Sequence, residues 1–211
     1  MLKVGVLVSG GGSNLQAILT GIETGQIPQT EVVGIVSNKK DAYALERGKK
    51  RGINSIYMNP KEYESVEAYE QALVHYFQER NTDLIVLAGF MRVLGDTFVN
   101  AFPNRIMNIH PSLIPSFCGK GYYGIKVHEA ALAYGVKVTG ATVHFVDLGT
   151  DTGPIILQKV VPILEEDTPE TLQKRVLEQG EWEVYPEAIA LYAQGRIEIE
   201  GRKVKVRGGK S

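Results

Sequence analysis

The residues best suited to chemistry lie in the stretch Asn108-Ile109-His110-Pro111. An apolar run typical of a buried strand ends here, and Pro111 prevents the strand from continuing. Residues two apart in a strand point to the same side, so Asn108 and His110 are predicted to face one cavity. Open α/β sheets bind their ligands at this carboxyl end of the strands. The alternative is a capped strand whose amide and imidazole only satisfy nearby backbone groups.

A carboxylate completes a possible catalytic set. Asp151 stands among small residues in the turn Asp151-Thr152-Gly153-Pro154, where it could face an imidazole, although Asp is also a common turn residue. The trio Asn108, His110 and Asp151 suits acyl transfer to an amine. The amide would stabilise a tetrahedral oxyanion, the imidazole would move protons, and the carboxylate would hold the imidazole charged. No activated Ser or Cys nucleophile is evident, which favours direct transfer without an acyl-enzyme.

A glycine-rich turn near the N-terminus predicts an anion site. A β-branched strand, Leu2–Val8, runs into Ser9-Gly10-Gly11-Gly12-Ser13-Asn14, and a helical pattern starts at Leu15. Glycines let the backbone approach a ligand, and the free N–H groups of a first helical turn favour phosphate. The alternative is a glycine turn with a Ser or Asn N-cap. The loop lacks the Gly-Lys-Ser/Thr of a Walker A motif, and no ribose-binding acid follows the next strand.

Strands and helices alternate as far as Ile109, which predicts an α/β fold with a doubly wound, mostly parallel sheet and helices on both faces. The expected strands are Leu2–Val8, Glu31–Ser37, Ile53–Tyr57, Asp83–Phe90, a strand ending at His110, Val136–Val146 and Ile155–Val161. The expected helices begin near Leu15 and cover Ala42–Arg51, Val66–Glu79, Gly95–Ala101, Lys126–Tyr134 and Pro169–Trp182, with Pro186 kinking or restarting the last one. Thr168 is its expected N-cap. Ser112–Val127 is expected to be a long, mobile loop over the site.

Bulk properties limit the possible functions. The 211 residues are enough for a single domain, 1–211, ending in a short basic hairpin and tail, 196–211. The formal net charge of −1 argues against a general nucleic-acid binder, and no apolar run is long enough to span a membrane. With no signal-peptide pattern and a single cysteine, Cys118, the chain is expected in the cytoplasm. Small-molecule substrates and a monomeric or homodimeric state are separate expectations.

Five motifs in order resemble those of the phosphoribosylglycinamide formyltransferases, which are folate-dependent enzymes. They are Gly12-Ser13-Asn14-Leu15-Gln16, Leu87-Ala88-Gly89-Phe90-Met91-Arg92, Asn108-Ile109-His110-Pro111-Ser112-Leu113, Val143-His144-Phe145-Val146 and Asp151-Thr152-Gly153-Pro154. The resemblance covers the chain from Leu2 to about Tyr192. It implies a Rossmann-like formyltransferase fold and a transferase of purine biosynthesis. Such an enzyme moves the formyl group of its cosubstrate 10-formyltetrahydrofolate to the amine of glycinamide ribonucleotide, without a metal.

The resemblance also implies roles for individual residues. Asn108 would polarise the formyl oxygen, His110 would donate a proton, and Asp151 would raise the pKa of the histidine and help to relay the proton. The residues expected to bind the ribonucleotide are Gly12, Ser13 and Asn14, at its phosphate, and Glu181. The residues expected to line the folate pocket are Met91, Arg92, Val93 and Leu94, together with Asn108.

Three features depart from the family pattern. The helix carrying Glu181 is one residue longer than usual, the loop Phe117–Tyr123 is longer, and Val66 replaces a common basic residue.

The alternative functions are a formyltetrahydrofolate deformylase, a methionyl-tRNA formyltransferase and a non-catalytic nucleotide-binding module. A metal hydrolase using His110, His128, His144 and Asp151 lacks paired ligand spacing. His128 and His144 are expected to pack near the site or bond to the backbone, and His75 to lie on the surface.

Overall fold

The computed structural model describes residues 1–208, so Gly209–Ser211 of the expected basic tail lie outside the described part. Its contacts divide the chain into two compact units, Met1–Asn108 and a second that begins at Ile109. The boundary falls inside strand β5 (Ile106–His110). The single domain expected from chain length therefore stays a prediction, and each unit is described by itself.

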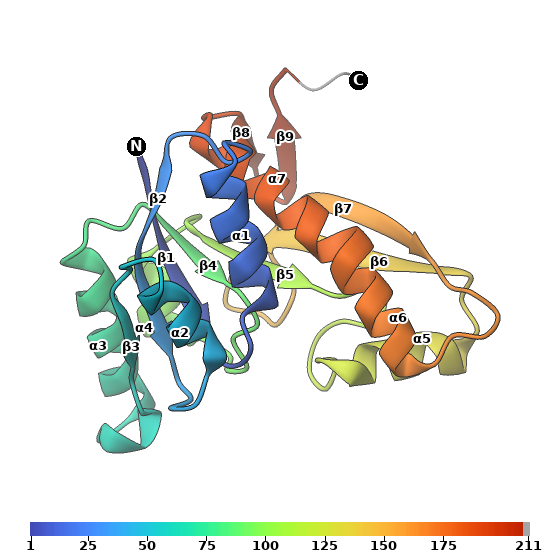
Figure 1. The fold of residues 1–211 in the computed structure, drawn as a ribbon, viewed down its shortest axis with the longest axis horizontal. Helices are drawn as coiled ribbons and strands as arrows, with labels where there is room; N and C mark the ends of the chain where they lie inside the picture. Colours follow the sequence, from blue (N-terminus) through green and yellow to red (C-terminus); the bar gives the residue numbers. More distant parts are fainter. Residues whose placement is uncertain (209–211) are drawn as a thin grey trace. The chain divides into compact units, whose positions relative to one another are not determined.

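The first unit is built on parallel strands in the order β3, β2, β1, β4, β5 (Figure 1). The strands that precede β5 are β1 (Leu2–Val8), β2 (Thr30–Ser37), β3 (Ser55–Tyr57) and β4 (Leu84–Leu87). The side chains from Val4 to Val8 are buried without alternation, as is usual for a parallel strand covered on both faces. This confirms the predicted α/β class and the parallel pairing.

The helices of this unit form two pairs. They are α1 (Ser13–Glu23), α2 (Tyr43–Lys49), α3 (Val66–Gln78) and α4 (Asp96–Ala101), with a short 3₁₀ helix η1 (Pro60–Glu62). Helices α1 and α2 pack together, as do α3 and α4. Right-handed crossovers place the two pairs on opposite faces, because the strand order reverses between β1 and β4. That reversal is the point at which doubly wound sheets bind ligands.

The second unit has a different sheet pattern. Its elements after β5 include α5 (Ile125–Tyr134), β6 (Val138–Phe145), β7 (Ile155–Pro162), β8 (Ile197–Glu200) and β9 (Lys203–Val206). Strand β6 pairs antiparallel with β7, and β8 with β9, which confirms the expected hairpin around Gly201. Helix α5 starts at Ile125, so the irregular loop after β5 is shorter than the expected Ser112–Val127.

The helix that begins at Pro169 is interrupted in an unexpected place. It consists of α6 (Pro169–Val176), a π-helical turn η2 (Leu177–Glu181) and α7 (Trp182–Ala193). Thr168 caps α6 by accepting from the Thr171 N–H at 3.3 Å, as predicted. The predicted restart at Pro186 is wrong, because Pro186 lies inside α7, whereas the predicted kink stays a prediction. Pro186 has no N–H to donate to the Trp182 carbonyl, and the π turn ends five residues earlier, at Glu181.

Within residues 1–208, none of the helices combines the length and the apolar character that crossing a membrane requires.

Candidate active site

In the first unit, the glycine-rich turn after β1 is braced from two sides. The Arg47 guanidinium of α2 donates to the Gly11 carbonyl at 2.8 Å and to Gln16 Oε1 at 2.9 Å. Ser9 ties the turn to neighbouring strand ends, since its Oγ donates to Asn38 Oδ1 at 2.6 Å and accepts from the Met91 N–H at 2.8 Å. A turn held this firmly presents its N–H groups in a fixed geometry, which is what binding an anion requires.

The N-terminus of α1 is not capped by a side chain. Its N-cap is Gly12, in the left-handed region at φ 70°, and no side chain caps the helix. No acidic residue occupies the first turn. The predicted alternative of a Ser or Asn N-cap is therefore wrong, because the helix starts at Ser13 itself. The positive end of the helix dipole is left available to a ligand's negative charge.

Among the glycines of this turn, Gly12 is the one whose replacement should destabilise the protein most. A Cβ there would lie 2.7 Å from the Ala44 Cβ, on a backbone with φ of +70°. We expect Gly12→Ala to lower the free energy of unfolding by about 1–3 kcal/mol, as measured by denaturant unfolding. Gly11→Ala is the matched control, because a Cβ at Gly11 meets nothing within 4 Å. Equal effects of the two substitutions would contradict a special role for Gly12.

The segment after β4 supplies both exposed and buried apolar side chains. Met91 and Val93 are 54% and 71% exposed, whereas Leu94 is buried. The Arg92 guanidinium lies over the Tyr69 ring, 5.6 Å from its centroid. Two exposed apolar side chains next to the strand reversal fit the expected lining of a folate pocket, whereas Leu94 packs in the core. The role of this segment, residues 91–94, in ligand binding stays a prediction.

Asn108 and His110 are both on β5, as predicted. Strand geometry directs their side chains to the same side of β5. Asn108 is half-buried and His110 is buried. In the second unit, His110 Nε2 lies 2.9 Å from the Phe117 carbonyl oxygen and Nδ1 lies 3.4 Å from Asp151 Oδ2. The imidazole is thus held from both of its nitrogens, and the carboxylate expected from the sequence does face it.

Asp151 has further partners that the sequence reasoning did not anticipate. Its Oδ2 accepts from the Gly119 N–H at 2.9 Å, and its Oδ1 lies 3.6 Å from His144 Nε2. His144 Nδ1 lies 2.8 Å from the Phe145 carbonyl oxygen. The contact of His144 with the backbone agrees with the prediction, whereas its contact with Asp151 was not predicted.

The two residues that face His110 both adopt an unusual backbone conformation. Phe117 has φ of 48° and Asp151 has φ of 58°, in the left-handed region. Asp tolerates this region, whereas a bulky aromatic residue rarely occupies it. Strain of this kind persists where the surrounding structure imposes it, and such positions cluster at functional sites. Phe117 is held by aromatic packing, with its ring centroid 6.3 Å from that of Tyr122 and 5.9 Å from that of Tyr134.

His110, Asp151 and His144 form a cluster of side chains. Burial and neighbouring charges shift the pKa values of His110 and Asp151 within it. Burial acts to raise the pKa of Asp151, but the hydrogen bond with His144, the His110 charge and the Gly119 N–H hold it below its ordinary value. Burial lowers the pKa of His110, although Asp151 and the Phe117 carbonyl act in the opposite direction. The expected effect of Asp151 on His110 is therefore present, but burial outweighs it, and the net direction is down.

Two other titratable side chains border the cluster. His128 of α5 is buried, its Nδ1 has no hydrogen-bond partner, and burial together with the nearby His110 lowers its pKa to about 4. Burial and Asp151 raise the pKa of the Cys118 thiol, which makes it a poor nucleophile. In the described part of the chain, no three His, Cys, Asp or Glu side chains gather in a way that would hold a metal ion.

The loop between β5 and α5 is tied to the strands of its own unit. Thr142 Oγ1 donates to the Ser112 carbonyl at 2.6 Å and accepts from the Ile114 N–H at 3.1 Å. Gln158 Nε2 donates to the Ile114 carbonyl at 3.1 Å. These bonds anchor the first part of the loop, which places the Phe117 carbonyl beside His110. Sequence periodicity could not reveal them, because they join residues far apart in the chain.

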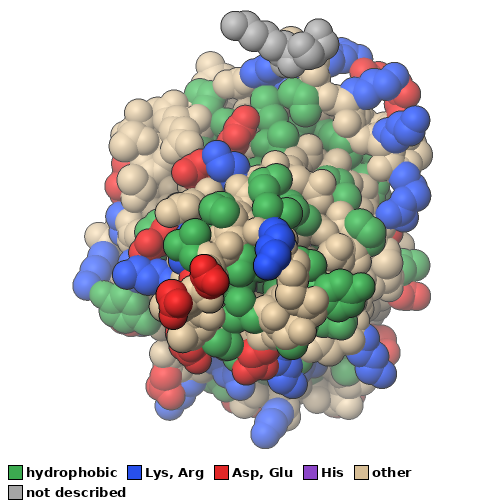
Figure 2. Space-filling model, turned by 90° about the vertical axis from the view of Figure 1, so that its right-hand side faces the viewer, with side chains coloured by type: hydrophobic (Ala, Val, Ile, Leu, Met, Phe, Trp, Pro, Cys, Tyr) green, Lys and Arg blue, Asp and Glu red, His purple; other side chains and the backbone are tan. Residues whose placement is uncertain are grey.

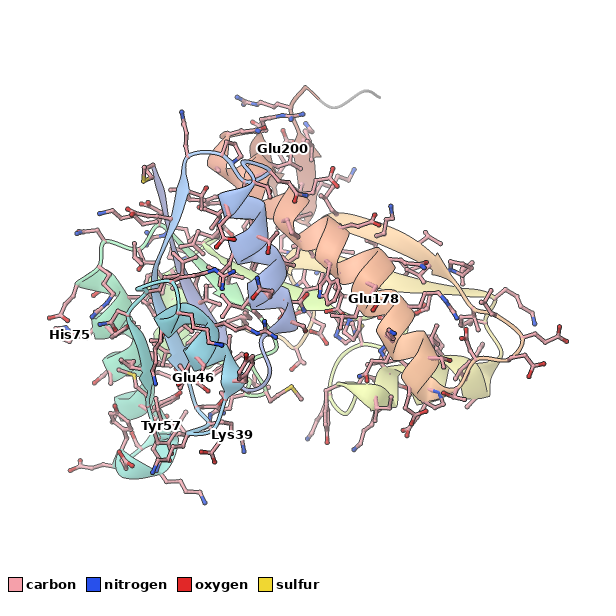
Figure 3. All side chains as sticks on the ribbon, viewed as in Figure 1. Lys39, Glu46, Tyr57, His75, Glu178 and Glu200 are labelled. Atoms are coloured by element: carbon pink, nitrogen blue, oxygen red, sulfur yellow. The ribbon has the colours of Figure 1, made fainter. Side chains whose placement is uncertain are left out.

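Glu181 closes the π turn and is buried, with 9% of its surface exposed. A π turn accommodates one extra residue while the helix on either side keeps its face. The extra residue expected in this helix from the resemblance stays a prediction, and the π turn is a place that could accommodate it. Glu178, which Figure 3 labels in the same turn, has a side chain that is 43% exposed.

The four histidines differ in exposure: His75 lies on the surface, and the other three are buried. His75 points away from α3, as Figure 3 shows, and its side chain is 75% exposed, which confirms the sequence prediction. His110, His128 and His144 are all buried. No histidine is visible on the face drawn in Figure 2, where hydrophobic and charged side chains are interspersed.

Comparison with known proteins places the chain in a family. The formyl transferase family model matches residues 2–189. A phosphoribosylglycinamide formyltransferase of Escherichia coli (strain K12) is 40% identical over 198 residues, covering 94% of this chain and 90% of the relative. The crystal structure of glycinamide ribonucleotide transformylase 1 from Symbiobacterium toebii superposes with a TM-score of 0.92 at 49% identity, covering 98% of this chain and 94% of that one.

Longer relatives contain a similar region. The trifunctional purine biosynthetic protein adenosine-3 of Chironomus tentans is 41% identical over 201 residues, and this chain spans only 14% of its length. The matched region covers both the glycine-rich turn and the Asn108-x-His110 strand end. With a family model that matches most of its length, the chain belongs to the formyl transferase family.

Proposed function

We propose that this chain transfers the formyl group of 10-formyltetrahydrofolate to the amine of phosphoribosylglycinamide, in purine biosynthesis. The observation that carries the proposal is the buried imidazole of His110, held 3.4 Å from the Asp151 carboxylate and two residues after Asn108 on one strand. The similarity to proteins named for this reaction supports the same substrates.

In the proposed reaction, the substrate amine attacks the formyl carbon and an oxyanion forms. The Asn108 amide donates to that oxygen, where a preorganised donor stabilises the transition state. The attacking nitrogen loses a proton and the leaving folate nitrogen gains one as the carbon–nitrogen bond breaks. His110 takes the first proton and donates it to the leaving group, while Asp151 stabilises the imidazolium in between. The proton count balances and no covalent intermediate forms on the enzyme.

The binding roles follow the same proposal. Gly12, Ser13 and Asn14 bind the phosphate of the ribonucleotide at the N-terminus of α1, and Glu181 also contacts this substrate. The residues that line the folate site are Met91, Arg92, Val93 and Leu94, with Asn108. A cytoplasmic location and a monomeric or homodimeric state belong to the same proposal.

The decisive experiment measures release of tetrahydrofolate from 10-formyltetrahydrofolate, with and without phosphoribosylglycinamide. Release that requires the ribonucleotide, with formation of the formylated product, supports the transferase. Release that proceeds equally well without it would identify a deformylase. Binding of the ribonucleotide with no release at all would identify a non-catalytic binding module.

Glu181 offers a test of substrate binding. A hydrogen bond to a charged carboxylate contributes about 1.5–3 kcal/mol. We therefore expect Glu181→Gln to raise KM for the ribonucleotide about 10- to 100-fold, with a smaller change in kcat, in steady-state kinetics. Glu178→Gln is the matched control in the same π turn, since Glu178 is exposed. A normal KM in the Glu181 variant would remove this residue from the binding site.

A further inference from the structure

The carboxylate of Glu70, on helix α3, is buried and binds the start of another helix. Glu70 is 3% exposed, and its Oε1 accepts from the Gly95 N–H at 2.6 Å. Its Oε2 accepts from the Phe98 N–H at 3.2 Å. Burying a carboxylate is costly unless its oxygens are hydrogen-bonded, and here both are. The proposed reaction gives this carboxylate no task.

The two N–H groups that Glu70 binds are those that a capping box satisfies. Gly95 is the N-cap of α4, and Phe98 is the third residue of that helix. In a capping box, the N-cap side chain accepts from the third N–H, and the side chain of the third residue accepts from the N-cap N–H. Neither Gly95 nor Phe98 has a side-chain acceptor. One carboxylate from α3 replaces both, and it ties the start of α4 to α3.

The capped end of α4 directly follows the segment 91–94. The other end of this segment is also fixed, because the Ser9 Oγ accepts from the Met91 N–H at 2.8 Å. Between these two anchors, the side chains of Met91 and Val93 are 54% and 71% exposed. The exposed apolar side chains therefore stand on a short stretch of backbone that is held at both ends.

We propose that Glu70 is a positioning residue for folate binding. By holding the Gly95 N–H, it fixes the end of the segment 91–94, and it is too buried to touch the ligand itself. A binding surface that is already ordered loses less conformational entropy when its ligand binds, so the affinity is higher. The effect on folate binding rests on the proposed function, whereas the capping of α4 does not.

Two substitutions weaken this tether to different extents. Glu70→Ala removes both hydrogen bonds, whereas Glu70→Gln keeps the size of the side chain and loses one bond, because its amide nitrogen is a donor. We expect KM for 10-formyltetrahydrofolate to rise about 10-fold in Glu70→Ala and less in Glu70→Gln, with little change in KM for the ribonucleotide. Glu67→Ala is the matched control, since it removes an exposed carboxylate from the same helix.

A cap supplied by α4 itself separates helix capping from positioning. Gly95 has an extended backbone with φ of −91° and ψ of −174°, as N-cap residues do, so Ser can replace it. The carboxylate that a Cβ at Gly95 would meet at 3.1 Å is absent in the double variant Glu70→Ala/Gly95→Ser. Its new hydroxyl can accept from the Phe98 N–H, while the tether to α3 stays broken. We expect this variant to recover the thermal stability lost in Glu70→Ala but to keep the raised KM for the folate.

Binding and spectroscopy test the inference without turnover. Calorimetric titration with tetrahydrofolate should give a Kd about 10-fold higher in Glu70→Ala and in the double variant than in the wild type. Titration with phosphoribosylglycinamide should give the same Kd in all three proteins. In ¹⁵N-labelled wild type, the Gly95 amide proton should resonate downfield, because it is hydrogen-bonded to a carboxylate at 2.6 Å, and Glu70→Gln should change its shift.

An unchanged affinity for tetrahydrofolate in a folded Glu70→Ala variant would overturn the inference. So would a double variant that recovers folate affinity together with stability, because the capping of α4 alone would then explain the effect. If Glu70→Ala does not fold, Glu70→Gln and the double variant carry the same comparison. If the wild type shows no formyl transfer while its tetrahydrofolate affinity depends on Glu70 as expected, the proposed function fails and the role of Glu70 stands.

Discussion

Replacing His110 by Ala should lower kcat by about 10²- to 10⁴-fold with little change in KM, because general acid–base transfer by a positioned side chain contributes that much. The imidazole of His110, at the end of β5, faces the Asp151 carboxylate. The His110 side chain is only 5% exposed, which limits the access of competing water. Steady-state formyl transfer measures the loss. His75→Ala is the control, since it removes an exposed imidazole.

The pH dependence gives a second measurement of the same residue. Burial lowers the pKa of His110 below its ordinary value of 6.5, so the free protein holds a neutral ring at pH 7. A neutral ring is needed to accept the proton of the attacking amine. We expect kcat/KM to be constant above this pKa and to fall as pH decreases through it, below pH 6.5. A His110→Ala variant that keeps this acid limb and the wild-type rate would show that another group moves the proton.

Replacing Asn108 by Ala should lower kcat by about 10²- to 10³-fold, the usual effect of removing one oxyanion donor. Strand β5 directs its amide to the same side as the His110 ring, and a strand positions a donor more firmly than a loop does. Asn108→Asp is the informative companion, because it keeps the size of the side chain but replaces the donor with a negative charge. It should be at least as impaired as the Ala variant.

Two results would contradict the role of Asn108 as an oxyanion donor. Near-normal kcat in both Asn108 variants, with formyl transfer still dependent on His110, would mean that the oxyanion is stabilised elsewhere. A loss confined to KM for the folate would instead make Asn108 a binding residue. Measuring both substrates' KM values separates these results from the expected loss in kcat.

Features determined by adjacent residues could be predicted from the sequence. The helix at Pro169 starts where predicted because Thr168 accepts from an N–H three residues away. The β1 strand, its glycine turn and the position of Asn108 and His110 on β5 also follow from local pattern and strand alternation. His75 was correctly placed on the surface because it lies off the apolar face of its helix.

Features that depend on contacts between distant residues required the tertiary structure. The helix is interrupted by a π turn at Leu177–Glu181, before Pro186, and Gly180 of that turn packs against β6 and β7, where an added Cβ would lie 3.3 Å from the Ala141 Cβ. The helix propensities of neighbouring residues do not reflect this packing between a helix and distant strands. Likewise, burial reverses the pKa shift that Asp151 alone would give His110, and only folding brings His144 to the second oxygen of Asp151. The sequence determined which groups are available for chemistry, whereas burial and long-range contacts decided their protonation and their partners, because both depend on residues far away in the chain.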